Sequence, residues 1–219
     1  AIAVALGQQG CTVAFCYSSD EVGAKETQAA VEATGAKALA IKCDISDASS
    51  VDAAFSEVEA AFGPVTVLVN NAAGSEGGDG PVAELTDDAW DAAFRVNVTA
   101  PFRLCRAAIP HMRAAGHGAI VNISTRQAER ASKGFTAYVA SKSALNGLTR
   151  AIAVDYGAEN IRCNTISPGY VLNRVRDADI SDERRLRYEG MHVTRLGVAD
   201  DIVTTALLAV MKRRVAEAS

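Results

Sequence analysis

Val65-Thr66-Val67-Leu68-Val69 is a nearly continuous apolar run, and Asn70-Asn71-Ala72-Ala73-Gly74 follows it directly. A short run rich in β-branched residues predicts a strand, and the scarcity of polar residues within it predicts burial of both faces. Similar runs lie at 12–17, 37–43, 118–124 and 160–167. Helix-like segments separate them at 21–34, 46–62, 87–115 and 136–157. This alternation predicts an α/β fold in which helices cover both faces of a parallel sheet.

The composition narrows the class of protein. The chain has 219 residues, 49% of them hydrophobic, which predicts a single domain over 1–219 with a sizeable buried core. A formal net charge of −4 without a basic cluster argues against a nucleic-acid partner. No run of 18 apolar residues occurs, so no membrane-spanning segment is predicted.

The cysteines and histidines favour a reducing compartment and no metal site. The five cysteines contain no Cys-x-x-Cys pair, which suits a cytoplasmic protein. Cys16 and Cys43 fall within strand-like runs, and we expect them in the core. The three histidines lack metal-ligand spacing and are expected on the surface or in loops.

Local signals predict where the helices begin, bend and end. Thr86 or Asp87 is a plausible N-cap for the helix at 87–115. Gly35 and Gly63 are expected to end the two helices before it. Pro101 and Pro110 would kink the segment 87–115 without necessarily ending it.

Tyr138 and Lys142 stand four residues apart in Tyr138-Val139-Ala140-Ser141-Lys142, and therefore share one face of a predicted helix. A fixed ammonium near a phenol favours the phenolate, which makes the tyrosine a usable acid or base nearer neutral pH. Alone, such a pair is better explained as a solvated helix face. Four further motifs of the sequence change that interpretation: Asn70-Asn71-Ala72-Ala73-Gly74, Asn97, Ile120-Val121-Asn122-Ile123-Ser124-Thr125 and Asn164-Thr165-Ile166-Ser167-Pro168-Gly169.

In this order the motifs resemble the short-chain dehydrogenase/reductase family, in its shorter single-domain branch, among members similar to 3-oxoacyl-[acyl-carrier-protein] reductases. The resemblance runs from the first residues to about Val203. It implies a Rossmann-like doubly wound parallel sheet in three α/β/α layers, and hydride transfer between a nicotinamide cofactor and a carbonyl or alcohol. It also implies that Tyr138 exchanges the proton, Lys142 holds the nicotinamide ribose, and Asn97 orders a proton-relaying water. A solvent-facing Asn97 is the alternative.

The position of the family's catalytic serine holds a threonine in this chain. That serine stands thirteen residues before the tyrosine, which is Thr125 here, while Ser124 lies one residue nearer the strand. Threonine has the same hydroxyl donor and acceptors, but its methyl group stiffens the side chain and crowds a substrate. We therefore expect Thr125 to polarise the carbonyl with altered substrate tolerance. An impaired site, or a loop offset that brings Ser124 into place, are the alternatives.

The resemblance also implies where the cofactor binds. The contacts are Asp44 and Ile45 at the adenine, Asn71 and Ala72 after the next strand, Pro168, Gly169 and Val171 at the nicotinamide, together with Tyr138 and Lys142. Asp44 has a structural alternative as the N-cap of the next helix, a role that Ser46 or Asp47 could fill instead. Asn173 replaces the threonine that follows the Pro-Gly turn in the family.

The residues after the strand at 12–17 favour NADP(H), with NAD(H) as a possible cofactor. An acid at that strand end would bond the adenine ribose hydroxyls and repel a 2′-phosphate. Tyr17-Ser18-Ser19 offers none, although Asp20 follows closely. Ser18 is the candidate contact there.

Both ends depart from the family pattern. Residue 1 already has a helical pattern that ends near Gly7 and Gly10, and the family's first strand with its Thr-Gly-x-x-x-Gly-x-Gly turn is missing. The last strand is missing too. We interpret this as an incomplete record of a longer enzyme, with a truncated product as the alternative. A chain limited to 1–219 is expected to bind the cofactor poorly.

Assembly and two rival functions complete the expectations. The alanine-rich helices at 87–115 and 136–157 are the ones that the family pairs into homodimers and homotetramers. Residues 175–190 are expected to form a substrate flap, and residues 75–80 a mobile surface loop. A sugar-nucleotide epimerase or dehydratase would lack the Pro168-Gly169 turn. A catalytically silent nucleotide-binding module is the rival from another class.

Overall fold

The computed structural model describes the chain except for residues 75–77, 173–176, 179, 191, 193–194 and 212–219. Its five strands are β1 (Val13–Tyr17), β2 (Ala38–Lys42), β3 (Val67–Asn70), β4 (Gly118–Ile123) and β5 (Ile161–Ile166). Each predicted strand is confirmed, with ends that differ by at most two residues. All three strand pairings are parallel, as the alternation of strands and helices predicted.

The strands form two groups instead of one continuous sheet. β1 pairs with β2, and β3, β4 and β5 pair in that order. In the larger group Asn70 stands opposite Asn122, which in turn stands opposite Thr165. No ladder joins β1 to β3 within the described part of the chain, in keeping with the expectation of a sheet that lacks the family's first strand.

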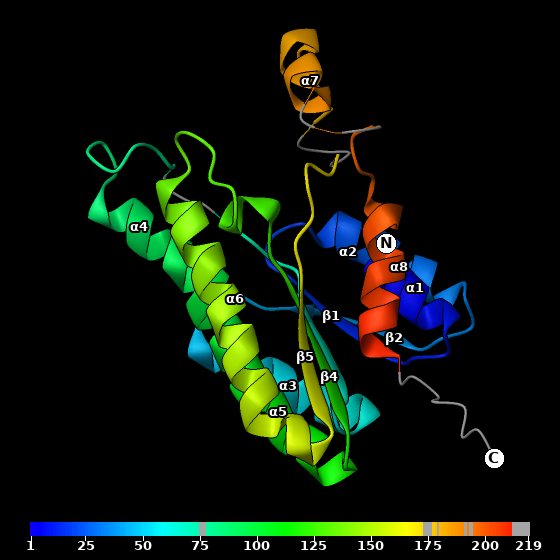
Figure 1. Ribbon diagram of the computed structural model, residues 1–219. Helices are drawn as coiled ribbons and strands as arrows, with labels where there is room; N and C mark the ends of the chain where they lie inside the picture. Colours follow the sequence, from blue (N-terminus) through cyan, green and yellow to red (C-terminus); the bar gives the residue numbers. More distant parts are fainter. Residues whose placement is uncertain (75–77, 173–176, 179, 191, 193–194, 212–219) are drawn as a thin grey trace, which may run out of the picture.

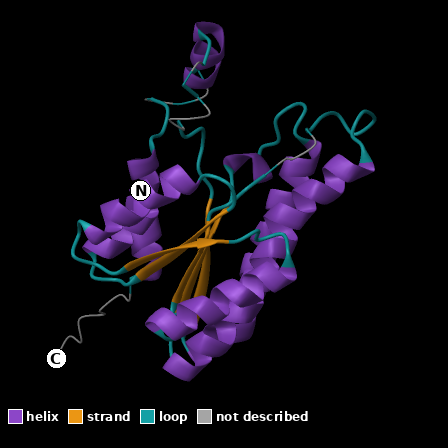
Figure 2. Cartoon of the chain, turned by 180° about the vertical axis from the view of Figure 1, so that it is seen from behind, coloured by secondary structure: helices purple, strands orange, loops and turns teal. Residues whose placement is uncertain are grey.

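Helices cover both faces of the strands and give the predicted three layers (Figures 1 and 2). One layer holds α1 (Ile2–Gln8), α2 (Glu21–Glu32) and α8 (Ala199–Val210), and the other holds α3 (Ala48–Phe62), α5 (Ala100–Ala115) and α6 (Thr136–Tyr156). The short α7 (Asp182–Glu189) lies apart from both layers (Figure 1). None of the helices in the described ranges is long and apolar enough to span a membrane.

The segment predicted as one helix at 87–115 has three parts. Thr86 caps α4 (Asp87–Phe94) by accepting a hydrogen bond from the backbone of Ala89, as one of the two expected N-caps. A π-helical turn, η1 (Arg95–Thr99), then precedes α5. Pro101 has no N–H to donate to the carbonyl of Asn97, four residues earlier, so the regular helical bonding is interrupted there. Pro110 lies inside α5 without ending it.

The helix ends confirm one glycine prediction and correct another. Gly63, at φ +81°, ends α3 as expected. The helix α2 ends at Glu32 with Ala33 as its C-cap, so Gly35, at φ +88°, belongs to the following turn and is not the cap. Both glycines have the left-handed backbone that an L side chain rarely adopts.

The main core lies between the three-stranded group and the layer of α5 and α6. It is built from Cys105, Ala108, Ile109, Met112, Ile120, Ile152, Ile161 and Cys163. Burial raises the pKa of the Cys105 and Cys163 thiols to about 12, so both behave as small core residues. Cys43 is also buried, as predicted, but Cys16 is exposed, so the expectation that it lies in the core is wrong.

Candidate active site

The turns after β4 and β5 lie against each other at one edge of the sheet. These strands and β3 are parallel, so their carboxyl ends meet at the edge where open α/β sheets bind ligands. The backbone N–H of Ser124 donates to the carbonyl of Ile166 at 2.8 Å. The N–H of Arg126 donates to the carbonyl of Pro168 at 2.9 Å. The segments containing Thr125 and the Pro168-Gly169 turn are thereby brought together.

A buried polar network fixes this edge from below. The side chain of Asn70 donates to Asn122 Oδ1 at 2.7 Å, and Asn122 donates to Thr149 Oγ1 at 2.8 Å. Thr165 donates to the same hydroxyl at 2.9 Å. Strands β3, β4 and β5 and helix α6 are therefore held in one register, because a broken bond would leave a buried group unpaired. Asn70 thus ties β3 to β4.

Lys142 is the largest polar side chain buried in the site. It is 2% exposed, and its ammonium donates to the carbonyl of Ile123, the last residue of β4, at 2.8 Å. Burial strips water from the ammonium and lowers the pKa of Lys142 to about 8. An ammonium has three donors, and Ile123 is its one acceptor among the described residues.

Tyr138 lies one turn before Lys142 on α6, as the spacing predicted. It is half-buried, and its ring meets the edge of Phe135 with 6.4 Å between the ring centres. Its backbone carbonyl accepts a hydrogen bond from the hydroxyl of Ser141 at 3.0 Å. The phenol, the ammonium and a buried hydroxyl thus share the first two turns of one helix.

Asn97 is completely buried, so its alternative as a solvent-facing residue is wrong. Its Oδ1 accepts from the N–H of Gly74 at 3.1 Å, and its Nδ2 donates to the carbonyl of Gly74 at 2.9 Å. The same Nδ2 donates to the Ser141 hydroxyl at 3.0 Å. Asn97 therefore joins the segment after β3 to α6. Sequence reasoning missed Gly74 and Ser141 as its partners, although both lie within motifs that were quoted for other reasons.

Ser124 and Thr125 are both buried, and their hydroxyls have different partners. Ser124 donates to the carbonyl of Lys142 at 3.4 Å, so its hydroxyl is engaged with the backbone of α6. Thr125 Oγ1 accepts from the N–H of Gln127 at 3.2 Å and caps the short 3₁₀ helix η2 (Arg126–Ala128). A hydroxyl that accepts from the backbone keeps its own proton to donate to a substrate oxygen.

The candidate cofactor residues follow the ends of four strands. Ser18, Asp44, Asn71, Ala72 and Gly169 are exposed, whereas Ile45, Pro168 and Val171 are half-buried. Asp47 caps α3 by accepting from the N–H of Ser50 at 2.9 Å, so the alternative of Asp44 as N-cap is wrong. Asp44 instead accepts from the N–H of Ser46 at 2.9 Å. Asp20 caps α2 through the N–H of Gly23.

Two hollows lie near the carboxyl edge of β5. One, of about 320 Å³, is lined by residues that include Gly169, Val171 and His192. Nε2 of His192 accepts from the backbone of Tyr170 at 3.1 Å, so His192, expected at the surface or in a loop, contacts the turn that was assigned to the nicotinamide. A Cβ at Gly169 would lie 2.8 Å from that nitrogen, which explains the glycine.

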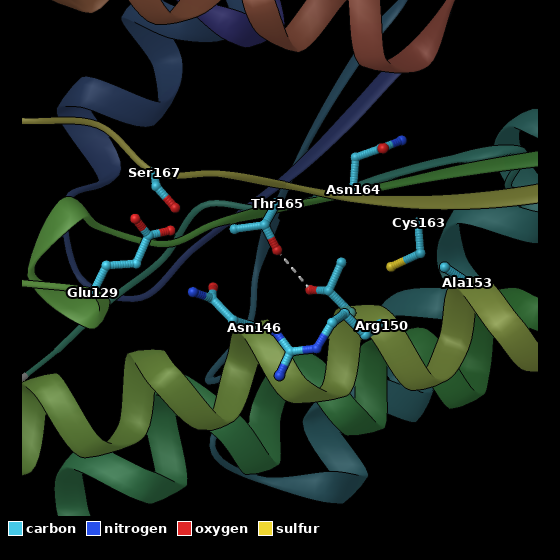
Figure 3. A pocket seen from close by; sticks show the side chains of 9 residues that line it. Glu129, Asn146, Arg150, Ala153, Cys163, Asn164, Thr165 and Ser167 are labelled. Carbon is cyan, nitrogen blue, oxygen red and sulfur yellow. Dashed lines mark hydrogen bonds between the residues drawn. The ribbon is translucent and has the colours of Figure 1, made fainter.

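The other hollow, of about 350 Å³, lies between α6 and β5 and contains none of the predicted site residues (Figure 3). Thr149 and Thr165 meet inside it, and Glu129, Asn146 and Arg150 line it. Of the other sequence expectations, Asn173 and part of the flap at 175–190 lie outside the described residues, as do residues 75–77 of the loop at 75–80.

Fold and site together define a Rossmann-like α/β protein, and comparisons with known proteins identify its family. A family model described as "Enoyl-(Acyl carrier protein) reductase" matches residues 1–213. The chain therefore belongs to the short-chain dehydrogenase/reductase family, which places it among the oxidoreductases. It is 40% identical to a 3β-hydroxysteroid dehydrogenase of Mediterraneibacter gnavus over 168 residues, which make up 77% of this chain and 60% of that enzyme.

Solved structures agree. A blue fluorescent protein from a metagenomic library, in complex with NADPH, superposes with a TM-score of 0.86 at 35% identity, covering 95% of this chain and 84% of the other. A 7α-hydroxysteroid dehydrogenase complexed with NADH and 7-oxo glycochenodeoxycholic acid gives a TM-score of 0.87 at 29% identity, covering 95% and 81%. The fold predicted from the sequence is thus confirmed.

Proposed function

We propose that the protein interconverts a small-molecule carbonyl and the corresponding alcohol with NAD(P)(H), with Tyr138 as the general acid or base. The observation that carries this proposal is the buried ammonium of Lys142 one turn after Tyr138, held against the end of β4. Burying an ammonium costs folding free energy, and buried ionisable groups of this kind are concentrated at functional sites. This one lies at the edge of the sheet where ligands bind in this fold.

The residues divide the chemistry as follows. When bound, the nicotinamide cofactor supplies or accepts the hydride. In reduction Tyr138 donates a proton to the substrate oxygen, while Thr125 stabilises that oxygen with its hydroxyl. Lys142 holds the nicotinamide ribose and favours the phenolate of Tyr138. Asn97 supports a water that resupplies the proton. Each positioned hydrogen bond or proton transfer is commonly worth about 10²-fold in rate.

NADP(H) is the favoured cofactor, and NAD(H) the second. The contacts are Ser18, Asp44, Ile45, Asn71, Ala72, Pro168, Gly169 and Val171, together with Tyr138 and Lys142. The nearest acid after β1, Asp20, is the N-cap of α2 and does not occupy the strand end itself, the position from which a carboxylate would repel a 2′-phosphate. The two solved relatives hold NADPH and NADH respectively, so a fluorescence titration with each nucleotide is the direct test. Tighter binding of NADH would reverse the preference.

Exposed apolar side chains and the cysteines bear on the assembly and the compartment of the protein. We propose a cytoplasmic homodimer or homotetramer that pairs through α4, α5 and α6. Phe102 on α5 and Val154 on α6 are exposed on these helices, at 45% and 83%. The scattered cysteines support a reducing compartment.

Replacing Tyr138 by Phe tests the activity. The change removes only the phenol oxygen, so kcat should fall by at least about 10²-fold while NADPH binding stays nearly intact. Tyr156→Phe, at the other end of the same helix, is the matched control and should keep normal turnover. Saturable NADPH binding with no turnover of any tested carbonyl or alcohol by the unaltered protein would favour the silent nucleotide-binding module instead.

A further inference from the structure

The catalytic helix α6 begins without a capping residue of its own. Its N-cap position, Phe135, offers no side-chain hydrogen bond. The first N–H groups of any α-helix lack partners within the helix, and the N–H groups of the second and third helical residues are the usual targets of a cap. In α6 these residues are Ala137 and Tyr138, so one of the two N–H groups that Phe135 leaves without a partner belongs to the proposed acid.

Asp79 supplies the missing cap from 58 residues earlier in the chain. Its Oδ1 accepts from the N–H of Ala137 at 3.0 Å, and its Oδ2 accepts from the N–H of Tyr138 at 2.9 Å. Oδ1 also accepts from the N–H of Gly80 at 2.8 Å, which orients the carboxylate. One bond per oxygen to two successive N–H groups fixes the first turn of α6 both in position and in direction. Bonds of this kind to an ionised acceptor are about twice as strong as neutral ones.

The segment that carries Asp79 is tied to α6 at a second point. Gly74 is joined to Ser141 through the side chain of Asn97. The same segment begins with Asn71 and Ala72, the proposed cofactor contacts after β3. Two separate ties therefore connect the chain after β3 to the helix that carries the proton donor, one at Ala137 and Tyr138 and the other at Ser141.

We propose that Asp79 is a positioning residue for the reaction, which aligns Tyr138 with the cofactor-binding segment by clamping the N-terminus of α6. The proposal rests on the proposed function, because it assumes that Tyr138 exchanges the proton. Asp79 acts through the backbone of α6 and has no assigned contact with substrate or cofactor. Its negative charge also opposes the positive end of the helix next to Tyr138. A nearby negative charge disfavours a phenolate, so removing it should make the phenolate easier to form.

The test compares Asp79→Ala and Asp79→Asn with Asp87→Asn, an exposed acid in the first turn of α4 that serves as the matched control. Asp79→Ala should lower kcat by about 10-fold or more, the scale of a misplaced catalytic group, with the Kd for NADPH changed by less than about threefold. Asp79→Asn keeps one acceptor oxygen, so its kcat should lie between that of Asp79→Ala and that of the unaltered protein. In alcohol oxidation the rising limb of the pH profile should move to lower pH in both Asp79 variants, and stay unchanged in Asp87→Asn.

A measurement that needs no turnover separates the capping of α6 by Asp79 from its positioning role in the reaction. Hydrogen exchange should be faster at the N–H groups of Ala137 and Tyr138 in Asp79→Ala, and unchanged in Asp87→Asn. Faster exchange together with a normal kcat and pH profile would show that Asp79 caps α6 but would overturn its positioning role in the reaction. Unchanged exchange would overturn the proposal altogether. Absence of turnover in the unaltered protein would instead refute the proposed function, and the exchange result would still decide whether Asp79 clamps α6.

Discussion

At the scale of single residues, burial of the Lys142 ammonium opposes folding. Its pKa is about 8 in the folded chain against 10.5 for an exposed lysine, because burial removes water from the ammonium. Below pH 8 both states hold the proton and the penalty is fully present. Between pH 8 and 10.5 the unfolded chain keeps a proton that the folded chain releases, so stability rises with pH.

This linkage predicts the behaviour of Lys142→Met. The unaltered protein should gain about 3 kcal/mol of unfolding free energy relative to the variant as pH rises from 8 to 10.5, at 1.36 kcal/mol per pKa unit. Urea unfolding across that range measures it, and the cysteine titrations cancel in the difference. The exposed Lys133→Met should show no such trend. A difference between the unaltered protein and Lys142→Met that is constant with pH would contradict the assignment.

Two adjacent hydroxyls decide the register of the substrate-polarising residue. Thr125→Ala should lower kcat by about 10²-fold, because its hydroxyl matters most as charge builds on the substrate oxygen. Thr125→Ser keeps the hydroxyl, and should retain activity and accept bulkier substrates. Ser124→Ala loses only the 3.4 Å bond to the carbonyl of Lys142 and should leave kcat nearly unchanged. Steady-state kinetics that show the reverse pattern would place Ser124 in the role.

At the scale of elements, local sequence patterns predicted which segments form strands and helices, but they did not predict the π-helical turn or the cap of α6. The apolar runs located every strand, and Thr86 was one of two proposed caps for α4. The π-helical turn was not predicted as such, although its signals were present: an Asn in mid-helix at 97 and Pro101 four residues later. The cap of α6 could not be predicted, because Asp79 is 58 residues away from Ala137 and only the tertiary fold brings them together.

The hydrogen bonds of Asn97 tie the π-helical turn to Gly74 and to Ser141 on α6. Asn97→Ala should lower the unfolding free energy by about 2–4 kcal/mol, because it leaves the half-buried N–H and carbonyl of Gly74 and the buried hydroxyl of Ser141 without their partner. Thermal or urea unfolding measures the loss. Ser56→Ala on α3, whose exposed hydroxyl bonds only within its own helix, is the control and should change stability little. Equal losses in the two variants would show that the Asn97 network contributes nothing special.

At the scale of the whole molecule, the sequence predicted the layers, the parallel strands and the lack of the family's first strand, and the structure added which of the strands pair. Strand identity is a local property that five apolar runs reveal, whereas pairing depends on which strands become neighbours in space. Likewise the motifs predicted the edge at which the site lies, and the structure added the contacts across it. The bond from Lys142 to Ile123 and the contact of His192 with Tyr170 join segments whose spacing carries no recognisable pattern.

The proposed assembly makes the last prediction. If two-fold pairing buries α5 and α6, then Val154→Glu should place two carboxylates close together in a desolvated interface and convert the oligomer to monomers. Phe102→Glu on α5 should act in the same direction. Val22→Glu is the matched control, because Val22 is 70% exposed but lies on α2 in the other layer. Light scattering at micromolar concentration measures the mass of each. A monomeric unaltered protein, or equal dissociation by Val22→Glu, would exclude α5 and α6 as the interface.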